Sequence, residues 1–292
     1  MKWIDFEKPN TVEDAVKLLS DSGGNARAMA GGTDLIVMLR VGHPRVNPDV
    51  VVDIKSIPEL NELSYDANKG LTVGAAVECY KIYGDDNVNS HFSALNDSAT
   101  LIGGTQIQGR ASFGGNLCNA APSGDSIPNM IAHRAVATIT GPSGTREVPV
   151  EDICTGPGQT SIGSDELLIS INFPSNGAGF GANYIRFIPR NEMDIAVAGV
   201  GASVTIEDGK FTSARVSLAS VAPTPLLVEE AGEALVGQPV SEGAIQKAAD
   251  LAKAAEKPIS DMRGTADYRK HLCDVLTRRA LTTAVERAQG AS

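Results

Sequence analysis

Two pairs of adjacent glycines are the features of this sequence that most suggest a ligand site. The first pair lies in Ala30-Gly31-Gly32-Thr33-Asp34, between a predicted strand and a predicted helix. Glycine lets the backbone take positive φ angles and approach a ligand closely, and the start of a helix offers unpaired N–H groups to a phosphate. Because the GxGxxG fingerprint of dinucleotide-binding folds is absent, this motif alone fits a structural turn as well as an anion site.

The second pair lies in Ser112-Phe113-Gly114-Gly115-Asn116, inside a stretch from residue 103 to 128 that is rich in Gly, Asn, Ser and Pro. We interpret the stretch as a long polar loop, and such loops are usually functional. Its glycines could present a second set of backbone amides to the same anion, and Ser112 and Asn116 could bind phosphate or sugar oxygens. Asp125 could accept hydrogen bonds from sugar hydroxyls, or could simply cap a helix that begins near Ile127.

The composition of the 292-residue chain is that of an ordinary globular protein, with 42% hydrophobic and 21% charged residues. A formal net charge of −10 argues against nucleic acid binding, since there is no basic stripe to neutralise phosphates. It also disfavours anionic membranes, and no apolar run approaches the roughly 20 residues that span a bilayer. The first residues lack the apolar stretch of a secretory signal, so we expect a mature N-terminus and a cytoplasmic location.

The cysteines and histidines are scattered and show no metal-binding spacing. None of the four cysteines belongs to a CxxC pair, so a zinc or iron–sulfur site within this chain is not expected. Cys118 lies close to the second glycine pair, with no adjacent His or basic residue to lower its pKa, which favours a packing role over a nucleophilic one. Any metal chemistry is therefore expected to come from a partner.

The elements that would position the glycine motifs can be read from the apolar pattern. A capping box at Thr11 begins one helix, a second begins near Leu35, and apolar strands over residues 26–30 and 50–54 are of the buried kind. This pattern indicates a small α/β unit. The middle of the chain adds strands over residues 71–75, 135–140, 146–150 and 167–173, and a helix over residues 94–102.

The last part of the chain has a different pattern. Asp208-Gly209 separates two apolar runs, 198–207 and 210–219, and predicts a β-hairpin with a tight two-residue turn. Beyond Pro225 the pattern is helical, with helices predicted over residues 226–235, 241–256 and 268–287. These changes divide the chain into residues 1–57, 58–176 and 177–292.

The two glycine motifs, in this order, resemble those of a known protein family. AGGTDLI and SFGGNLCNAAPSGD are similar to the FAD-binding subunit of the molybdenum hydroxylases, which include xanthine dehydrogenase, carbon monoxide dehydrogenase, and the nicotinate and isoquinoline oxidoreductases. Two later segments fit the same family, Tyr184-Ile185-Arg186-Phe187 and Asp261-Met262-Arg263-Gly264. The resemblance covers essentially the whole chain.

The resemblance implies an α+β fold: a p-cresol methylhydroxylase-type FAD-binding domain of two α/β subdomains, followed by a C-terminal domain with a small antiparallel sheet and helices. It places the FAD diphosphate against the first glycine turn and the second motif on the same cofactor. Asp125 is implied on ribityl or sugar hydroxyls, Ile102 on the adenine side, Leu168 as an apolar backbone contact and Arg186 near the flavin. The implied contacts are Ala28, Met29, Ala30, Gly31, Gly32, Thr33, Asp34, Leu35, Ile102, Ser112, Phe113, Gly114, Gly115, Asn116, Asp125, Leu168 and Arg186.

The sequence departs from the family pattern at three points. Gln108-Gly109 replaces the usual Arg-Asn of the second motif, and Phe113 replaces the common Ile. The cysteine-bearing insertion of the benzoyl-CoA reductase branch is absent, so no additional cluster is expected.

The resemblance also implies partners and a direction of electron flow. A large molybdopterin-binding subunit oxidises the organic substrate, and a small subunit with two [2Fe–2S] clusters passes the electrons to this FAD. The FAD then reduces NAD, a quinone or oxygen, and the assembly is expected to be a dimer of heterotrimers. No residue of this chain is assigned as a general acid or a nucleophile.

Two other functions remain open from the sequence. One is a self-contained flavin-dependent oxidase of the vanillyl-alcohol oxidase type, although the residues after Pro174 leave little room for a substrate domain. The other is a scaffold that has lost its flavin, against which the intact glycine pairs and Asp125 argue.

Four arginines near the C-terminus also have two interpretations. They form either a solvated or salt-bridged helix face or a surface that binds another subunit. The four are Arg263, Arg269, Arg278 and Arg279.

Overall fold

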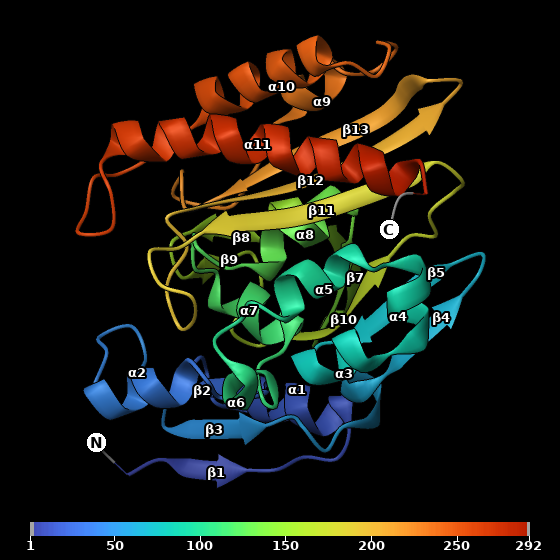
Figure 1. Ribbon diagram of the computed structural model, residues 1–292. Helices are drawn as coiled ribbons and strands as arrows, with labels where there is room; N and C mark the ends of the chain where they lie inside the picture. The colour runs from blue at the N-terminus through green and yellow to red at the C-terminus, as the bar shows by residue number, and fades with distance from the viewer. Residues whose placement is uncertain (1–2, 291–292) are drawn as a thin grey trace.

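The computed structural model describes residues 3–290, which form three larger β-sheets in succession with helices between and around them (Figure 1). The N-terminal sheet lies at one end of the molecule and the C-terminal sheet, with its covering helices, at the other. Most of the short helices of the middle segment lie between these two ends.

The N-terminal sheet is parallel and leads directly into the first glycine pair. Its strand order is β1-β3-β2, with β1 at Asp5–Glu7, β3 at Val50–Asp53 and β2 at Ala26–Met29. The side chain of Thr11 caps helix α1 (Val12–Asp21), as the capping box predicts. Strand β2 passes through Gly31-Gly32 into helix α2 (Leu35–Val41), which ends at Gly42. The glycine turn therefore sits at the carboxyl edge of a parallel sheet, where ligands commonly bind.

The middle sheet is antiparallel, with strand order β4-β5-β10-β6-β7. The chain leaves it after β5 for a run of short helices and closes it with β10. The strands are β4 (Leu63–Asp66), β5 (Gly70–Gly74), β6 (Val136–Gly141), β7 (Gly144–Pro149) and β10 (Leu167–Phe173). The short elements around it are two 3-10 turns (Pro58–Asn61 and Val150–Asp152) and the small hairpin of β8 (Cys154–Gly156) and β9 (Gln159–Thr160).

The predicted long polar loop over residues 103–128 is wrong, because short helices occupy much of it. None of them is long enough to be stable alone, but their apolar side chains Phe113, Leu117 and Ile127 are fully buried. Burial against the core therefore overrides the glycine-rich local composition. The helices of residues 103–128 are α6 (Thr105–Gln108), α7 (Phe113–Asn119) and the start of α8 (Ser126–Ala132), and they follow α3 (Cys79–Gly84), α4 (Asp86–His91) and α5 (Ala94–Ala99).

The first two sheets share one hydrophobic core. Leu19 and Val52 of the N-terminal unit belong to the same buried cluster as Val73, Phe113 and Ile171 of the middle unit. A cofactor held between the two units therefore has walls that are fixed to one another by packing.

The C-terminal part is an antiparallel sheet with helices on one face, in strand order β11-β12-β13-β14. Asp208 and Gly209 both take positive φ, and they form the predicted tight turn between β12 and β13. The predicted helix over residues 226–235 is only partly correct, since Leu226 and Leu227 instead pair with β13. The elements are β11 (Phe180–Phe187), β12 (Ala198–Glu207), β13 (Lys210–Ala219), β14 (Leu226–Leu227), α9 (Glu229–Glu233), α10 (Glu242–Ala255) and α11 (Ala266–Ala288).

The C-terminal arginines differ from one another in their surroundings. Arg269 is buried and donates to the carbonyl oxygens of Val197 and Ser220 and to Asp261, so its role is structural. Arg278 pairs with Asp274, whereas Arg279 is exposed. The salt-bridged interpretation is thus confirmed for three of the four, Arg263, Arg269 and Arg278, and the solvated one does not hold for Arg269.

The C-terminal domain has its own core and rests on the middle helices. Side chains of its sheet pack against α10 and α11 in a second buried cluster. Helix α8 contacts β12 and β13, and helix α5 contacts β11. Among the described residues, no helix is long and apolar enough to cross a membrane.

Candidate functional site

A cavity of about 820 Å³ runs between the N-terminal and middle units. This volume falls within the range of about 300–1,000 Å³ that ligand pockets usually have. The first glycine turn and α2 form one side of it, and the start of α7 forms another. The remaining wall comes from the segment between β8 and β10.

The first glycine turn presents a row of unused backbone donors to this cavity. Residues 31 to 35 all line it. Within the described part of the chain, their amide nitrogens donate to no protein acceptor, whereas the next amide, of Ile36, bonds to the Gly32 carbonyl oxygen. Gly32 has φ +73°, a conformation that side chains disfavour. Adjacent unpaired N–H groups of this kind suit an anion such as a diphosphate.

Gly31 allows the backbones of the two glycine motifs to approach each other closely. A Cβ at this position would lie 1.9 Å from the carbonyl oxygen of Arg110, just before the second motif. Only glycine fits such an approach of two backbones. The contact explains how two motifs far apart in the sequence come to line one cavity.

The second glycine pair lies in the first turn of α7. Ser112 caps this helix, and its Oγ accepts a hydrogen bond from the amide of Gly115 at 3.0 Å. The amide of Asn116 is also used, since it donates to the Ser112 carbonyl oxygen. The amides of Gly115 and Asn116 therefore serve the helix, and only the first motif offers an unbroken row of free donors.

The two glycines of this pair face different surroundings. A Cβ at Gly114 would lie 2.4 Å from the carbonyl oxygen of Ala75, so Gly114 allows α7 to pack on the residue after β5. A Cβ at Gly115 would meet only the Ser112 hydroxyl, at 3.1 Å, and otherwise nothing within 4 Å. Gly114 is therefore needed for α7 to pack on the residue after β5, whereas the lack of a side chain at Gly115 leaves open space in the cavity.

Asn116 lines the cavity and is held in place from behind. Its Oδ1 accepts hydrogen bonds from the Ser126 hydroxyl at 2.7 Å and the Ser126 amide at 3.3 Å. The side-chain nitrogen of Asn116 (Nδ2) is thereby oriented, and no hydrogen bond to it is seen among the described residues, so it remains available to a ligand in the cavity.

Most of the residues implied by the family resemblance line this cavity, but three do not. Phe113 is fully buried in the core, and Asp125 and Arg186 form an ion pair with each other, 2.5 Å apart, behind the cavity wall. Those that line it are Ala28, Met29, Ala30, Gly31, Gly32, Thr33, Asp34, Leu35, Ile102, Ser112, Gly114, Gly115, Asn116 and Leu168.

Asp125 occupies the N-cap position of α8, but its side chain makes no capping hydrogen bond. Instead it accepts from the Tyr184 hydroxyl at 2.7 Å and from Arg186. Burial raises the pKa of Asp125 to about 6, with Arg186 and Tyr184 acting in the opposite direction. The capping interpretation is therefore wrong: the N-cap position is correct, but the side chain binds β11 instead of the helix.

Three charged or reactive side chains of the wall bear on its chemistry. Arg45, which the sequence analysis missed, lies on the wall and donates to the Pro157 carbonyl oxygen, and it offers positive charge to an anion. Asp34 faces the cavity, and desolvation raises its pKa. Cys118 also lines the cavity, where its side chain is exposed, and its surroundings raise the pKa of its thiol with no neighbouring cation to lower it, so it is no nucleophile at neutral pH.

The segment from residue 155 to 168 is the part of the wall that sequence reasoning largely missed. It carries Gly158 and Gly163, which flank β9 and line the cavity, and Gly156 at the end of β8. Arg146 donates to Glu166 and to the Ser161 carbonyl oxygen, which ties this segment to β7. Its repeated glycines were the available signal. Among the described residues there is no cluster of three or more side chains that could hold a metal ion.

Comparison with known families agrees with this geometry. Residues 2–176 match the FAD binding domain in molybdopterin dehydrogenase, and residues 183–284 match the CO dehydrogenase flavoprotein C-terminal domain. The chain thus carries an FAD-binding domain, and the cavity has the free amides and open space that a diphosphate-containing cofactor needs.

Full-length relatives agree as well. The carbon monoxide dehydrogenase medium chain of Afipia carboxidovorans is 34% identical, with 98% of each chain covered. A putative xanthine dehydrogenase FAD-binding subunit of Escherichia coli is 30% identical over 99% of this chain and 98% of the relative. A solved chain of carbon monoxide dehydrogenase from Oligotropha carboxidovorans superposes with a TM-score of 0.93 at 33% identity, covering 98% of this chain and 99% of that one. The chain therefore belongs to the FAD-binding medium subunits of the carbon monoxide dehydrogenase and xanthine dehydrogenase family of molybdenum hydroxylases.

Proposed function

We propose that this chain holds FAD in the 820 Å³ cavity and carries electrons from the [2Fe–2S] clusters of a small partner subunit to an external acceptor such as NAD, a quinone or oxygen. The observation that carries the proposal is the row of free amides at residues 31 to 35, which line a cavity in a chain of this family. FAD supplies the redox chemistry, and the protein supplies binding, orientation and electrostatics.

The first glycine turn would hold the diphosphate, with Arg45 adding positive charge from the facing wall. Gly115 would leave room for the cofactor, and the Asn116 side chain would donate to its oxygens. Ile102 and Leu168 would provide apolar contacts to the rings. Asp125 and Arg186 would act from behind the wall, through Ser126 and Asn116.

Two ionisable side chains of the wall, those of Cys118 and Glu166, are not poised to take a proton from an organic substrate. The thiol of Cys118 stays protonated, and Glu166 pairs with Arg146. We therefore assign substrate oxidation to a large molybdopterin-binding partner and expect two heterotrimers to associate.

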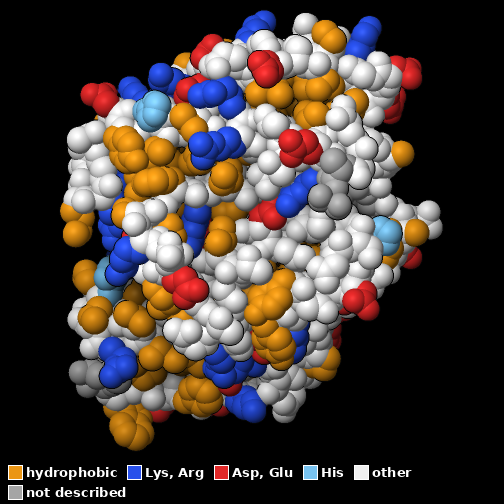
Figure 2. Space-filling view, viewed as in Figure 1, with side chains coloured by type: hydrophobic (Ala, Val, Ile, Leu, Met, Phe, Trp, Pro, Cys, Tyr) orange, Lys and Arg blue, Asp and Glu red, His pale blue; other side chains and the backbone are white. Residues whose placement is uncertain are grey.

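An exposed apolar surface supports the proposal of permanent partners. Three segments that lie along the left edge of Figure 1 carry it: the loop before α11, the loop between β11 and β12, and α2. Figure 2 shows hydrophobic and basic side chains interspersed along this edge. Large exposed apolar patches mark interaction sites. The exposed apolar residues of these segments are Ile36, Val37, Val41, Met193, Ile195, Ile259 and Met262, and Tyr268 in the first turn of α11 is exposed beside them in sequence.

The loop before α11 is preformed for such a contact. Asp261 accepts hydrogen bonds from Arg269 and from the amide of Arg263, which fixes the loop and leaves Met262 with 94% of its surface exposed. A side chain this apolar and this exposed, on a rigid loop, is suited to insertion into another protein.

Co-expression with the genomic neighbours tests the proposal. A tagged chain is expected to bring down iron and molybdenum with its flavin, because permanent interfaces bury more than about 2,000 Å². Met262→Asp should reduce the recovered metal, whereas Val236→Asp, at a 48% exposed apolar residue of the turn after α9, should not. Recovery of flavin without either metal from the unchanged chain would contradict the partner assignment.

A further inference from the structure

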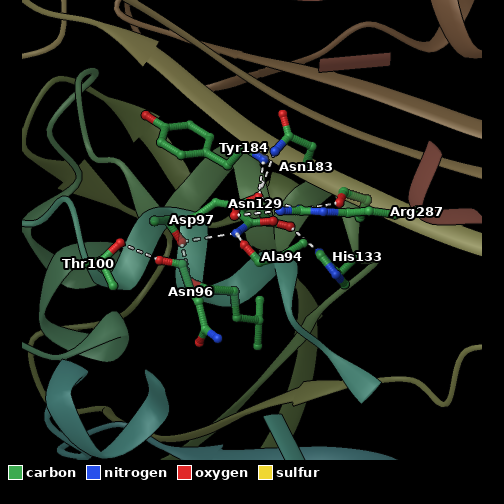
Figure 3. Close-up of polar contacts among 12 residues, drawn as sticks. Ala94, Asn96, Asp97, Thr100, Asn129, His133, Asn183, Tyr184 and Arg287 are labelled. Atoms are coloured by element: carbon green, nitrogen blue, oxygen red, sulfur yellow. Dashed lines mark hydrogen bonds and ion pairs between the residues drawn. The ribbon is translucent and has the colours of Figure 1, made fainter. Parts of the chain in front are cut away.

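Asp97 of α5 joins the FAD-binding half to the C-terminal domain through four hydrogen bonds. It accepts from both terminal nitrogens of Arg287, at 2.6 and 2.9 Å, from Asn183 at 2.8 Å and from the amide of Tyr184 at 3.1 Å. Figure 3 shows these donors converging on the carboxylate. Arg287 also donates to the Ala182 carbonyl oxygen at 2.7 Å. The middle of β11 is therefore held between α5 and the end of α11.

The same strand reaches the buried ion pair behind the cavity. Tyr184 and Arg186 lie two residues apart in β11, so their side chains project from the same face. Both bind Asp125, the tyrosine through its hydroxyl and the arginine through its guanidinium. The side chains of Arg186 and Asp125 are only 4% and 10% exposed. Pairs this well shielded depend strongly on geometry.

Asp125 connects this pair to the cavity wall. It precedes Ser126, whose hydroxyl and amide both hold Asn116, and Asn116 lines the cavity beside Gly115. An unbroken series of hydrogen bonds and chain neighbours thus runs from Arg287, near the end of the last helix, to the candidate cofactor site.

We infer that Arg287 and Asp97 are positioning residues for the FAD site: they hold β11 so that Tyr184 and Arg186 fix Asp125, and Asp125 in turn fixes the Ser126–Asn116 pair at the cavity. The inference rests on the proposed placement of FAD. It assigns to the C-terminal domain a role in retaining and orienting the cofactor, although none of the described residues of that domain lines the cavity.

A purely structural role for the pair makes a different prediction. If Arg287 only attached the two halves of the protein, its loss would lower the melting temperature and leave bound FAD unchanged. If it positions the site, its loss alters the affinity for FAD and the environment of the bound flavin. Networks of this kind modulate coupling by roughly 2- to 30-fold in affinity.

The test uses full-length chain whose FAD has been removed and is then titrated back. Arg287→Met keeps the apolar stem and is expected to weaken FAD binding by roughly 2- to 30-fold and to change the visible circular dichroism of the bound flavin. Arg287→Lys should recover part of both. Arg279→Met, at an exposed arginine of the same helix for which the described structure records no partner, should match the unchanged protein.

Tyr184→Phe removes only the hydroxyl bond to Asp125 and gives an answer even if Arg287→Met does not fold. Weaker FAD binding and an altered flavin spectrum in folded Tyr184→Phe would support the inference. FAD affinity and spectrum equal to the unchanged protein, in folded Tyr184→Phe or Arg287→Met, would overturn it. If Gly32→Val also kept full affinity, the placement of FAD in this cavity would itself be wrong, which distinguishes the two failures.

Discussion

Replacing Gly114 or Gly115 with Ala should change the stability of the protein in opposite directions. Gly114→Ala places a Cβ 2.4 Å from the backbone of Ala75, so α7 must move away from the residue after β5. We expect a loss of about 1–3 kcal/mol in the free energy of unfolding, as for other overpacked cores. Gly115→Ala meets only one hydroxyl, at 3.1 Å. In a helical turn, replacing Gly with Ala is worth about 0.5–1 kcal/mol of added stability.

Gly115→Ala, which is expected to stabilise the fold, should nevertheless weaken FAD binding. The added methyl group of Gly115→Ala enters the cavity, and overpacking there is expected to cost about 1–3 kcal/mol of binding, or about 5- to 150-fold in Kd. The assay pairs chemical unfolding of the FAD-free proteins with fluorescence titration of FAD. A folded Gly115→Ala protein that binds FAD as tightly as the unchanged chain would refute the placement of the second motif at the cofactor.

Three further predictions concern other positions. Gly32→Val should abolish FAD retention, because φ is +73° and the turn faces the cavity; Gly42→Val, with φ +65° but outside the cavity wall, should lose stability and keep its FAD. Burial lowers the pKa of His133 to about 4, so up to about 3 kcal/mol of stability should be lost as pH falls from 6.5 to 4, and a flatter pH profile is expected for His133→Phe. Both carboxylate oxygens of buried Glu256 lack a partner in the described structure, and desolvation raises its pKa to about 7; Glu256→Gln should therefore raise the melting temperature more at pH 8 than at pH 5.5. Equal pH dependence of His133→Phe and the parent, or of Glu256→Gln and the parent, would contradict the burial argument.

Much of the fold followed from local pattern. The Thr11 cap, the strands beside the first glycine pair and the Asp208-Gly209 turn depend on neighbouring residues, so the sequence alone predicted them. Helix α7 was missed, because its stability comes from burying Phe113 and Leu117 against distant strands. The pattern of neighbouring residues does not indicate burial against distant parts of the chain.

The sequence likewise predicted only part of the candidate site. The first glycine turn could be named as a candidate anion site, with a structural turn as the alternative, because its donors are adjacent in sequence. The structural roles of Gly31 and Gly114 could not be predicted, because each glycine makes room for the backbone of a residue distant in the sequence. Gly31 makes room for Arg110, and Gly114 makes room for Ala75. Asp125 was assigned to the cofactor or to a helix cap, and its partners on β11 could be seen only once the C-terminal domain was in place.

The most direct test of the electron-carrying role compares the assembled complex with and without FAD. The organic substrate of the large partner should first be identified by screening the intact complex. FAD is then removed, and cluster reduction and acceptor reduction are followed separately by rapid mixing. Substrate should still reduce the iron–sulfur clusters, electrons should no longer reach the acceptor, and added FAD should restore the transfer. An isolated, FAD-loaded chain that oxidises the organic substrate by itself would instead show a self-contained flavin oxidase and contradict the account.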